Sequence, residues 1–163
     1  MTTIVVGPCD ALSLALAEAF GDISVIDVDA GVDEVIWQTL VALQSAHTSM
    51  TGNGRVVLIV PTIGMAGAPG LVDHTTAIEG IRAMTKSAAR QWGFERIGVN
   101  MIAAPLSLFV ADADTSHLSA AAVQGDGRLI HSIVETAKFL SRNDLDHLTG
   151  ETIVVDGGSV MLP

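Results

Sequence analysis

At 163 residues and 16.9 kDa, the chain is long enough for a sizeable apolar core, and we expect residues 1–163 to form a single domain. The formal net charge of −10 argues against nucleic acid or an anionic membrane as a partner, because binding either one requires a basic surface. The single cysteine, Cys9, excludes an internal disulfide. No apolar run is long enough to span a bilayer and no secretory leader is visible, so we expect a cytoplasmic protein.

The first elements follow a strand, turn and helix pattern. Residues 3–6 are mostly β-branched and predict a short buried strand, and residues 7–10 predict a turn. Residues 11–20 are strong helix formers, with Leu12 and Leu16 on the inner side. Dinucleotide-binding folds use this order of elements to place a phosphate at the start of a helix.

The middle of the chain alternates helices with apolar strands. Residues 23–28 predict a second strand, and residues 32–46 predict a second helix. The run from Val56 to Val60 is apolar without alternation, which is typical of a strand buried on both faces of a parallel sheet. A glycine-rich loop follows, in which we expect no regular structure. From Asp73 the pattern becomes helical, and its apolar stripe contains Ile78, Ile81, Met84 and Thr85.

The last third predicts a buried strand at 96–103, a helix at 129–140 and a short final strand, whereas residues 107–127 show no interpretable pattern. The chain ends with Phe139-Leu-Ser-Arg, a few polar residues, Thr149-Gly150 and Val155-Asp-Gly-Gly158. This ending resembles the signature of the short-chain dehydrogenase/reductases, a family of single Rossmann-type domains. The strand, glycine loop and helix at 54–90 are similar to the middle of the same family.

The resemblance implies an α/β fold: a Rossmann-like, mostly parallel sheet of about five strands with flanking helices, shortened relative to the family. Asp27-Val-Asp-Ala-Gly31 is similar to the end of the family's fourth strand, so residues 23–28 match either that strand or the second one. Under the first match, the point at which strand order reverses is missing and part of one sheet face lies bare. The C-terminal elements or another subunit would then have to cover that face.

At the positions of the family's catalytic residues, the resemblance implies that this chain has lost the catalytic side chains. The family ends its central strand in Ser-Ser and opens the next helix with Tyr-x-x-x-Lys. Here the serine position is Thr62, the tyrosine position is His74 and the lysine position is Ile78. An imidazole can act as a general base near neutral pH, but no cation lies closer to His74 on the predicted helix than Arg82. We therefore predict no catalytic residue in this chain.

The cofactor positions are altered as well. In the family, the phosphate-binding turn has the sequence Gly-x-x-x-Gly-x-Gly, and the sixth strand is followed by Pro-Gly. The corresponding residues are Gly7, Ala11, Ser13 and Leu106. The lost glycines let the backbone approach a pyrophosphate, and Asp10 would cap the helix where that phosphate should lie. We therefore expect this chain to bind no cofactor, and NAD(P) to be bound only by a catalytic partner.

No other group of residues predicts a site. We expect Asp73 and Glu79 to face solvent. The five histidines lie at positions 47, 74, 117, 131 and 147, a spacing that predicts no metal site. Cys9 is interpreted as a plain small residue, because no base accompanies it.

The elements that the family uses for assembly are retained. In the family, the helix that opens with Tyr-x-x-x-Lys packs against its copy in a neighbouring subunit, and the last strand forms another contact. Here that helix carries small residues suited to close approach: Thr75, Thr76, Ala77, Gly80 and Ala83. We therefore predict a non-catalytic subunit, or pseudoenzyme, that assembles through residues 73–92 and 151–163. Its partner is a full-length catalytic relative, acting on a substrate such as a hydroxyacyl thioester, or a second copy.

Two alternatives stay open. One is a diverged oxidoreductase or lyase that uses His74 together with Thr62. The other is a stand-alone domain that binds a small molecule near residues 62–74 and 105–110.

Overall fold

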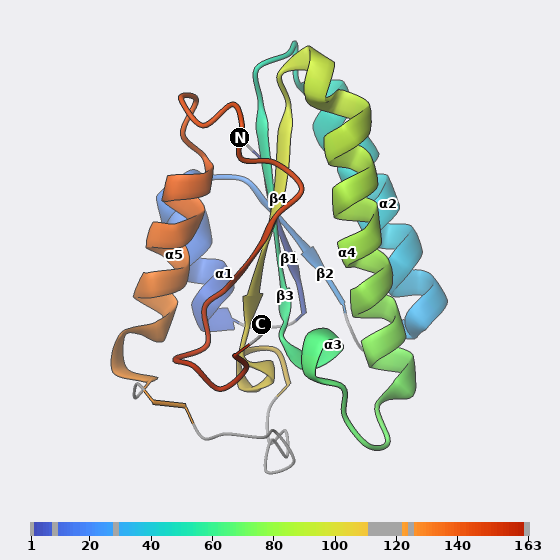
Figure 1. Ribbon diagram of the computed structural model, residues 1–163, viewed down its shortest axis with the longest axis vertical. Coiled ribbons are helices and arrows are strands. Elements are labelled where there is room, and N and C mark those ends of the chain that lie inside the picture. The colour runs from blue at the N-terminus through green and yellow to red at the C-terminus, as the bar shows by residue number, and fades with distance from the viewer. Residues whose placement is uncertain (1, 8–9, 28–29, 111–121, 124–125, 162–163) are drawn as a thin grey trace.

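The computed structural model describes residues 2–7, 10–27, 30–110, 122–123 and 126–161 (Figure 1). They form one parallel sheet between two layers of helices. Its strands are β1 (Thr2–Val6), β2 (Ile23–Ile26), β3 (Arg55–Pro61), β4 (Gly98–Ala104) and β5 (Thr152–Val154), in the order β2-β1-β3-β4-β5. Each neighbouring pair is parallel. The α/β class, the Rossmann-like arrangement and the expected strand number are confirmed.

The helices lie on both faces of this sheet. In the described part of the chain they are α1 (Asp10–Phe20), α2 (Val32–Ser49), α3 (Ile63–Ala66), α4 (Val72–Trp92) and α5 (Leu129–Leu140). Short 3-10 turns occupy Gly93–Glu95 (η2), Leu106–Leu108 (η3) and Asp126–Arg128 (η4). Figure 1 shows α1 and α5 on one face, and α2 and α4 on the other. None of the described helices has the length and apolar character that crossing a membrane requires.

The sheet order decides which family strand β2 matches. β2 pairs with β1 on the side away from β3, the place of the second strand in a doubly wound sheet. The match of residues 23–28 to the fourth strand is therefore wrong. The bare sheet face is wrong too, because right-handed crossovers to opposite sides of β1 put α1 and α2 on opposite faces. Strand order reverses between β1 and β3, so the reversal point is retained.

Apolar and polar residues do not alternate along β3, because both of its faces are buried. Every residue of this strand is buried. Val56, Leu58 and Val60 belong to the apolar cluster under α2 and α4, whereas Val57 and Ile59 belong to the cluster under α1 and α5. A strand covered by helices on both faces has no side that polar residues would stabilise.

The expectation of no regular structure after β3 is wrong for α3. The N–H groups of Met65 and Ala66 donate to the carbonyl of Thr62, and the N–H of Gly67 donates to the carbonyl of Ile63. Ile63 is buried in the core, so tertiary packing holds a helical turn that the glycine-rich sequence disfavours. Gly67, at φ +72°, ends the turn.

Candidate functional site

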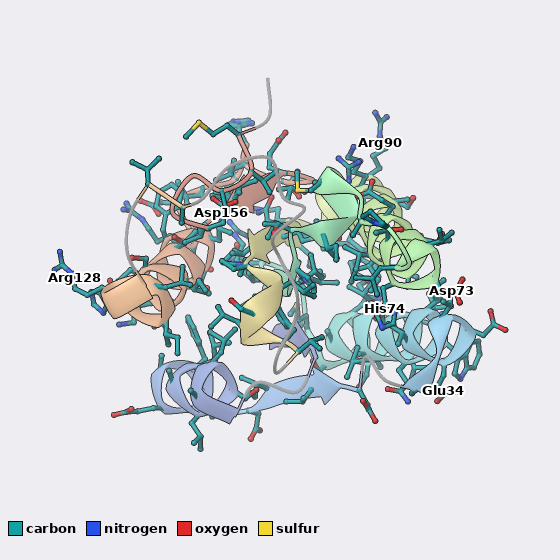
Figure 2. The ribbon with its side chains drawn as sticks, turned by 90° about the horizontal axis from the view of Figure 1, so that it is seen from below. Glu34, Asp73, His74, Arg90, Arg128 and Asp156 are labelled. Carbon is teal, nitrogen blue, oxygen red and sulfur yellow. The ribbon has the colours of Figure 1, made fainter. Side chains whose placement is uncertain are left out.

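The carboxyl edge of the sheet is the expected place for a ligand, because crevices form there where strand order reverses. Gly7 follows β1, Thr62 follows β3, and residues 105–109 follow β4 at this edge. It is the lower side of Figure 1, on which α3 lies, and Figure 2 views the molecule from this side. Residues 111–121 also follow β4, but they lie outside the described part of the chain.

Phe109 fills the space beside the one retained glycine of the phosphate turn. A methyl group built on Gly7 would lie 2.7 Å from Cδ1 of Phe109 and 3.0 Å from its Cβ. The side chain of Phe109 is 1% exposed and packs in the cluster that contains Leu12 and Leu16 of α1. The ring of Phe109 therefore occupies the space that the absent side chain of Gly7 leaves free.

Leu106 packs on the opposite face of the sheet from Phe109. It replaces the family's glycine after Pro105 and is buried in the cluster under α2 and α4, which includes Ile63 and Ile78. The η3 turn is closed by N–H groups of Phe109 and Val110, which both donate to the Leu106 carbonyl. One turn thus inserts an apolar side chain into the core on each face of the sheet.

The first turn of α1 lacks the second and third glycines of the family's phosphate turn. The first turn of α1 carries Ala11, which is exposed, and Ser13, whose hydroxyl is buried with no hydrogen-bond partner among the described residues. Neither residue offers the backbone access that a glycine gives. Residues 8–9 and the side chain of Asp10, whose capping role is a prediction, lie outside the described part.

Thr62 and His74 are not joined by a hydrogen bond in the described structure. Thr62 is fully buried, and its hydroxyl has no hydrogen-bond partner among the described residues. Its backbone N–H donates to the carbonyl of Ala104, an extension of the β3–β4 pairing. No base therefore lies within hydrogen-bond distance of this hydroxyl among the described residues.

Ile78 is a packing residue. It is buried in the core, and a methyl group on Gly64 of α3 would lie 2.6 Å from its Cγ2. α3 therefore contacts α4 at the position where the family has its lysine. An ammonium group there would be desolvated under α3, at a cost that the surrounding apolar residues do not offset.

His74 lines a cavity of about 160 Å³ between the beginnings of α2 and α4. Figure 2 shows its ring between these two helices. The other lining residues are Gly31, Val32, Val35, Asp73, Ala77 and Ile78. The structure therefore places His74 against α2.

The expectation that Asp73 and Glu79 face solvent is correct for Asp73 only. Asp73 is exposed at the first turn of α4. Glu79 is half-buried, and its Oε2 accepts hydrogen bonds from Arg82. Its Oε1 is buried with no hydrogen-bond partner among the described residues. The i, i+3 spacing to Arg82 is the signal that predicts this pairing.

The retained motif residues hold the last strand in place. Asn100 donates to the carbonyl of Leu148 and accepts from the N–H of Glu151. Thr149 accepts from the N–H of Val99, and Gly150 donates to the Val99 carbonyl. These bonds join β4 to the segment before β5, so the Thr-Gly pair serves the fold.

The Val-Asp-Gly-Gly tail is shaped by Asp156. Its carboxylate accepts from the N–H groups of Gly158 and Val160 and from the hydroxyl of Ser159, at 2.7–2.8 Å. Figure 2 shows Asp156 on a different part of the molecule from His74. Asp156 thus closes a turn, and these three hydrogen-bond partners all belong to that turn.

Two residues that the sequence does not single out hold the two ends of the sheet. At the carboxyl edge this residue is Phe109. At the amino edge it is Arg55, 3% exposed, whose guanidinium donates to the carbonyls of Gly54, Arg96, Arg142 and Asn143 and to the Asp146 carboxylate. An arginine opening an apolar strand is the signal for such an anchor.

Further ion pairs lie near the amino edge. Asp146 also accepts from Arg96, and the Arg96 guanidinium, with that of Arg55, holds the pKa of the Asp146 carboxyl below its ordinary value. His47 stacks on Trp92, with ring centroids 4.6 Å apart, and its Nε2 bonds Glu95 at 2.9 Å. No cluster of three or more metal-ligating side chains exists within the described ranges, and His117 lies outside them.

Comparisons with known proteins agree with this fold. A family model described as enoyl-(acyl carrier protein) reductase matches residues 6–160. The 3-oxoacyl-[acyl-carrier-protein] reductase FabG of Rickettsia bellii is 24% identical over 143 residues, which cover 83% of this chain and 59% of that protein. The chain therefore spans less than two thirds of that relative's length.

Two solved structures show the same fold at low identity. A short-chain dehydrogenase/reductase from Serratia marcescens aligns with a TM-score of 0.66 and 16% identity, covering 97% of this chain and 96% of that one. A blue fluorescent protein from a metagenomic library, in complex with NADPH, aligns with a TM-score of 0.71 and 17% identity, covering 98% of both chains. Together with the family model, these matches establish that the chain belongs to the short-chain dehydrogenase/reductases.

Proposed function

We propose that this chain is a non-catalytic short-chain dehydrogenase/reductase subunit that binds no NAD(P) itself and supports an active relative by assembling with it. A partner acting on an acyl thioester is the first candidate, because the Rickettsia relative is named a 3-oxoacyl-[acyl-carrier-protein] reductase. In the absence of that partner, the same surface joins two copies of the chain.

The packing of Phe109 against Gly7 carries this proposal. A dinucleotide needs the space beside that glycine, and here the ring occupies it as part of the core. Moving the ring aside would expose an aromatic side chain and leave a cavity beside Leu12 and Leu16. The binding free energy of the dinucleotide would have to exceed that cost before the chain had any measurable affinity for it.

The outer face of α2 and α4 supports assembly. Trp37 is 60% exposed on α2, and Val41 lies one turn farther on the same side. Ala77 is buried and Gly80 faces Ile36 of α2, so these two small residues serve packing within the chain. Apolar side chains exposed at the centre of a helical face are typical of protein interfaces.

Charges on this face are arranged so that two such faces complement each other. The carboxyl-edge ends of α2 and α4 carry Glu34 and Asp73, and the opposite end of α4 carries Lys86 and Arg90, all exposed. Glu34, Asp73 and Arg90 are labelled in Figure 2. Antiparallel pairing about a twofold axis sets each acidic end against a basic end.

Calorimetric titration of the purified chain with NADH and NADPH is expected to give no binding, because the site lacks both glycines and space. The metagenomic blue fluorescent protein, whose structure contains NADPH, is the positive control. Binding of either cofactor at micromolar concentration would refute the proposal.

Charge reversal tests the assembly face. Glu34→Lys with Asp73→Lys gives a face basic at both ends, and Lys86→Glu with Arg90→Glu gives a face acidic at both ends. Each variant alone is expected to self-associate about tenfold more weakly than the wild type. Mixed together, the two variants are expected to form a heterodimer, because each reversed end then meets its complement.

Sedimentation velocity measures both effects, and circular dichroism checks that each variant folds. Heterodimer formation by two variants that fail to self-associate is specific to the antiparallel arrangement. Failure of the mixture to associate, while the wild type does, would contradict this arrangement.

The cavity beside His74 favours a second candidate function, a domain that binds a small molecule. Its volume of about 160 Å³ and its mostly apolar lining suit a ligand of few atoms. A chain that stays monomeric in the sedimentation experiment, with or without a catalytic relative, would favour this candidate over assembly.

A further inference from the structure

Among the described residues, nothing pairs with the β2 edge of the sheet. β2 pairs with β1 on one side only, and the sheet order ends with it. Figure 2 shows β2 at the rim of the molecule between α1 and α2, with no other described element beyond it. Doubly wound sheets of the dinucleotide-binding type have a further strand in this place. Here the chain passes from β2 through α2 directly to β3, on the far side of β1.

Two residues of β2 direct their backbone groups toward this open side. The N–H of Gly7 donates to the carbonyl of Ile26 at 2.7 Å, so the backbone N–H and C=O groups of Ile26 point toward β1. Because backbone groups alternate along a strand, Ile23 and Val25 direct their N–H and C=O groups away from β1. Within the described part of the chain, neither residue makes a backbone hydrogen bond on that side. The edge therefore offers two donors and two acceptors in extended geometry.

β2 is short, which itself limits strand addition, but it carries neither the lysine nor the proline that often protects edge strands. Lysine, proline and bulges block strand addition in natural sheets. The residues of β2 are Ile-Ser-Val-Ile, without a charge or a proline. Val25 is 52% exposed, so an added strand would also cover apolar surface.

The surrounding charge decides what kind of strand can bind. The first 54 residues contain seven Asp or Glu and no Lys or Arg. They supply β1, α1, β2 and α2, the whole of this side of the molecule. Two copies meeting at this edge would bring these acidic regions together and repel each other. A segment with basic residues would be attracted.

We propose that the β2 edge binds an extended segment of a partner polypeptide in which Lys or Arg residues flank a short β-branched run. The segment adds to the sheet as a sixth strand, by backbone hydrogen bonds to Ile23 and Val25. This edge lies apart from the α2 and α4 outer face, and the inference does not depend on the assembly proposed above.

A designed peptide tests the inference: alternating threonine and valine, with two lysines at each end. Amide hydrogen exchange, followed by NMR, is expected to slow about tenfold at Ile23 and Val25 when the peptide is added to the full chain. The same peptide with glutamates at its ends is expected to bind much more weakly. A peptide N-methylated at every residue is expected to give no protection, because it has no backbone donors on either edge and its methyl groups block close approach of the strands.

A matched pair of variants tests the backbone contact. Val25→Pro removes an N–H that points away from β1, whereas Val25→Ala keeps this N–H and removes the same apolar side chain. Peptide binding is expected to be lost in the first variant and retained in the second. Protection elsewhere on the molecule, equal binding of the glutamate and lysine peptides, or self-pairing of the chain at Ile23 and Val25 would each overturn the inference. The wild-type exchange experiment decides the matter even if Val25→Pro does not fold.

Discussion

Replacing Phe109 with alanine is expected to lower the free energy of unfolding by about 3–5 kcal/mol, the usual cost of removing a fully buried aromatic ring. The ring is 1% exposed and lies against Gly7 in the cluster under α1 and α5. Neither a glycine nor the rigid strand ends can move to close the space. Urea unfolding followed by circular dichroism measures the change, and the m-value is expected to stay the same.

Phe94→Ala is the matched control. Phe94 is 84% exposed after α4, so the same chemical change there is expected to alter the free energy of unfolding by less than about 0.5 kcal/mol. If Phe109→Ala were equally mild and the variant bound NADPH, Phe109 would be a gate over a working cofactor site. That result would contradict both the stability prediction and the proposed function.

The sequence predicts the layers of the fold because burial leaves a local pattern. β3 is apolar without alternation, and its residues are divided between two helical layers. Leu12 and Leu16 are fully buried on the inner side of α1, as their spacing predicts. Patterns within one element suffice for such predictions, because each element buries its own face.

The place of β2 could not be predicted, because no local pattern states on which side of β1 a strand pairs. The similarity of Asp27-Val-Asp-Ala-Gly31 to the family's fourth strand favoured one placement, and the sheet order shows the other. The choice depends on the length of α2 and the hand of its crossover, which act between distant residues. The strand order of the sheet could therefore be determined only from the structure.

The candidate site shows the same limit. The departures from the family pattern at Thr62, His74 and Ile78 are visible in the sequence, but the packing around these residues is not. Phe109 is an aromatic residue after a strand, and its role depends on Gly7, about one hundred residues earlier. The helical turn of α3 likewise depends on the burial of Ile63. Contacts between distant segments decided each of these features.

Replacing Arg55 with methionine is expected to lower the free energy of unfolding by about 3 kcal/mol or more, because polar groups around the buried guanidinium lose their donors. Methionine keeps the length of the stem, so the change reports on hydrogen bonding more than on packing. All five N–H donors of Arg55 are used, at distances between 2.8 and 3.3 Å. The carbonyls of Arg142 and Asn143 are among the acceptors, so the loop before Thr149 is expected to loosen as well.

Arg96→Met is the control, since Arg96 bonds the same Asp146 carboxylate but its side chain is 63% exposed. An exposed ion pair contributes about 0–1 kcal/mol, so this variant is expected to remain close to the wild type. Hydrogen exchange at Gly150 and Glu151 is expected to accelerate in the Arg55 variant only, because these amides depend on the loop that Arg55 holds. Equal losses in both variants would show that the Asp146 charge, and not the buried donor set, stabilises this end of the sheet. The acyl-reductase relatives are longer, and in this shortened chain one buried arginine holds the segment that leads to the last strand.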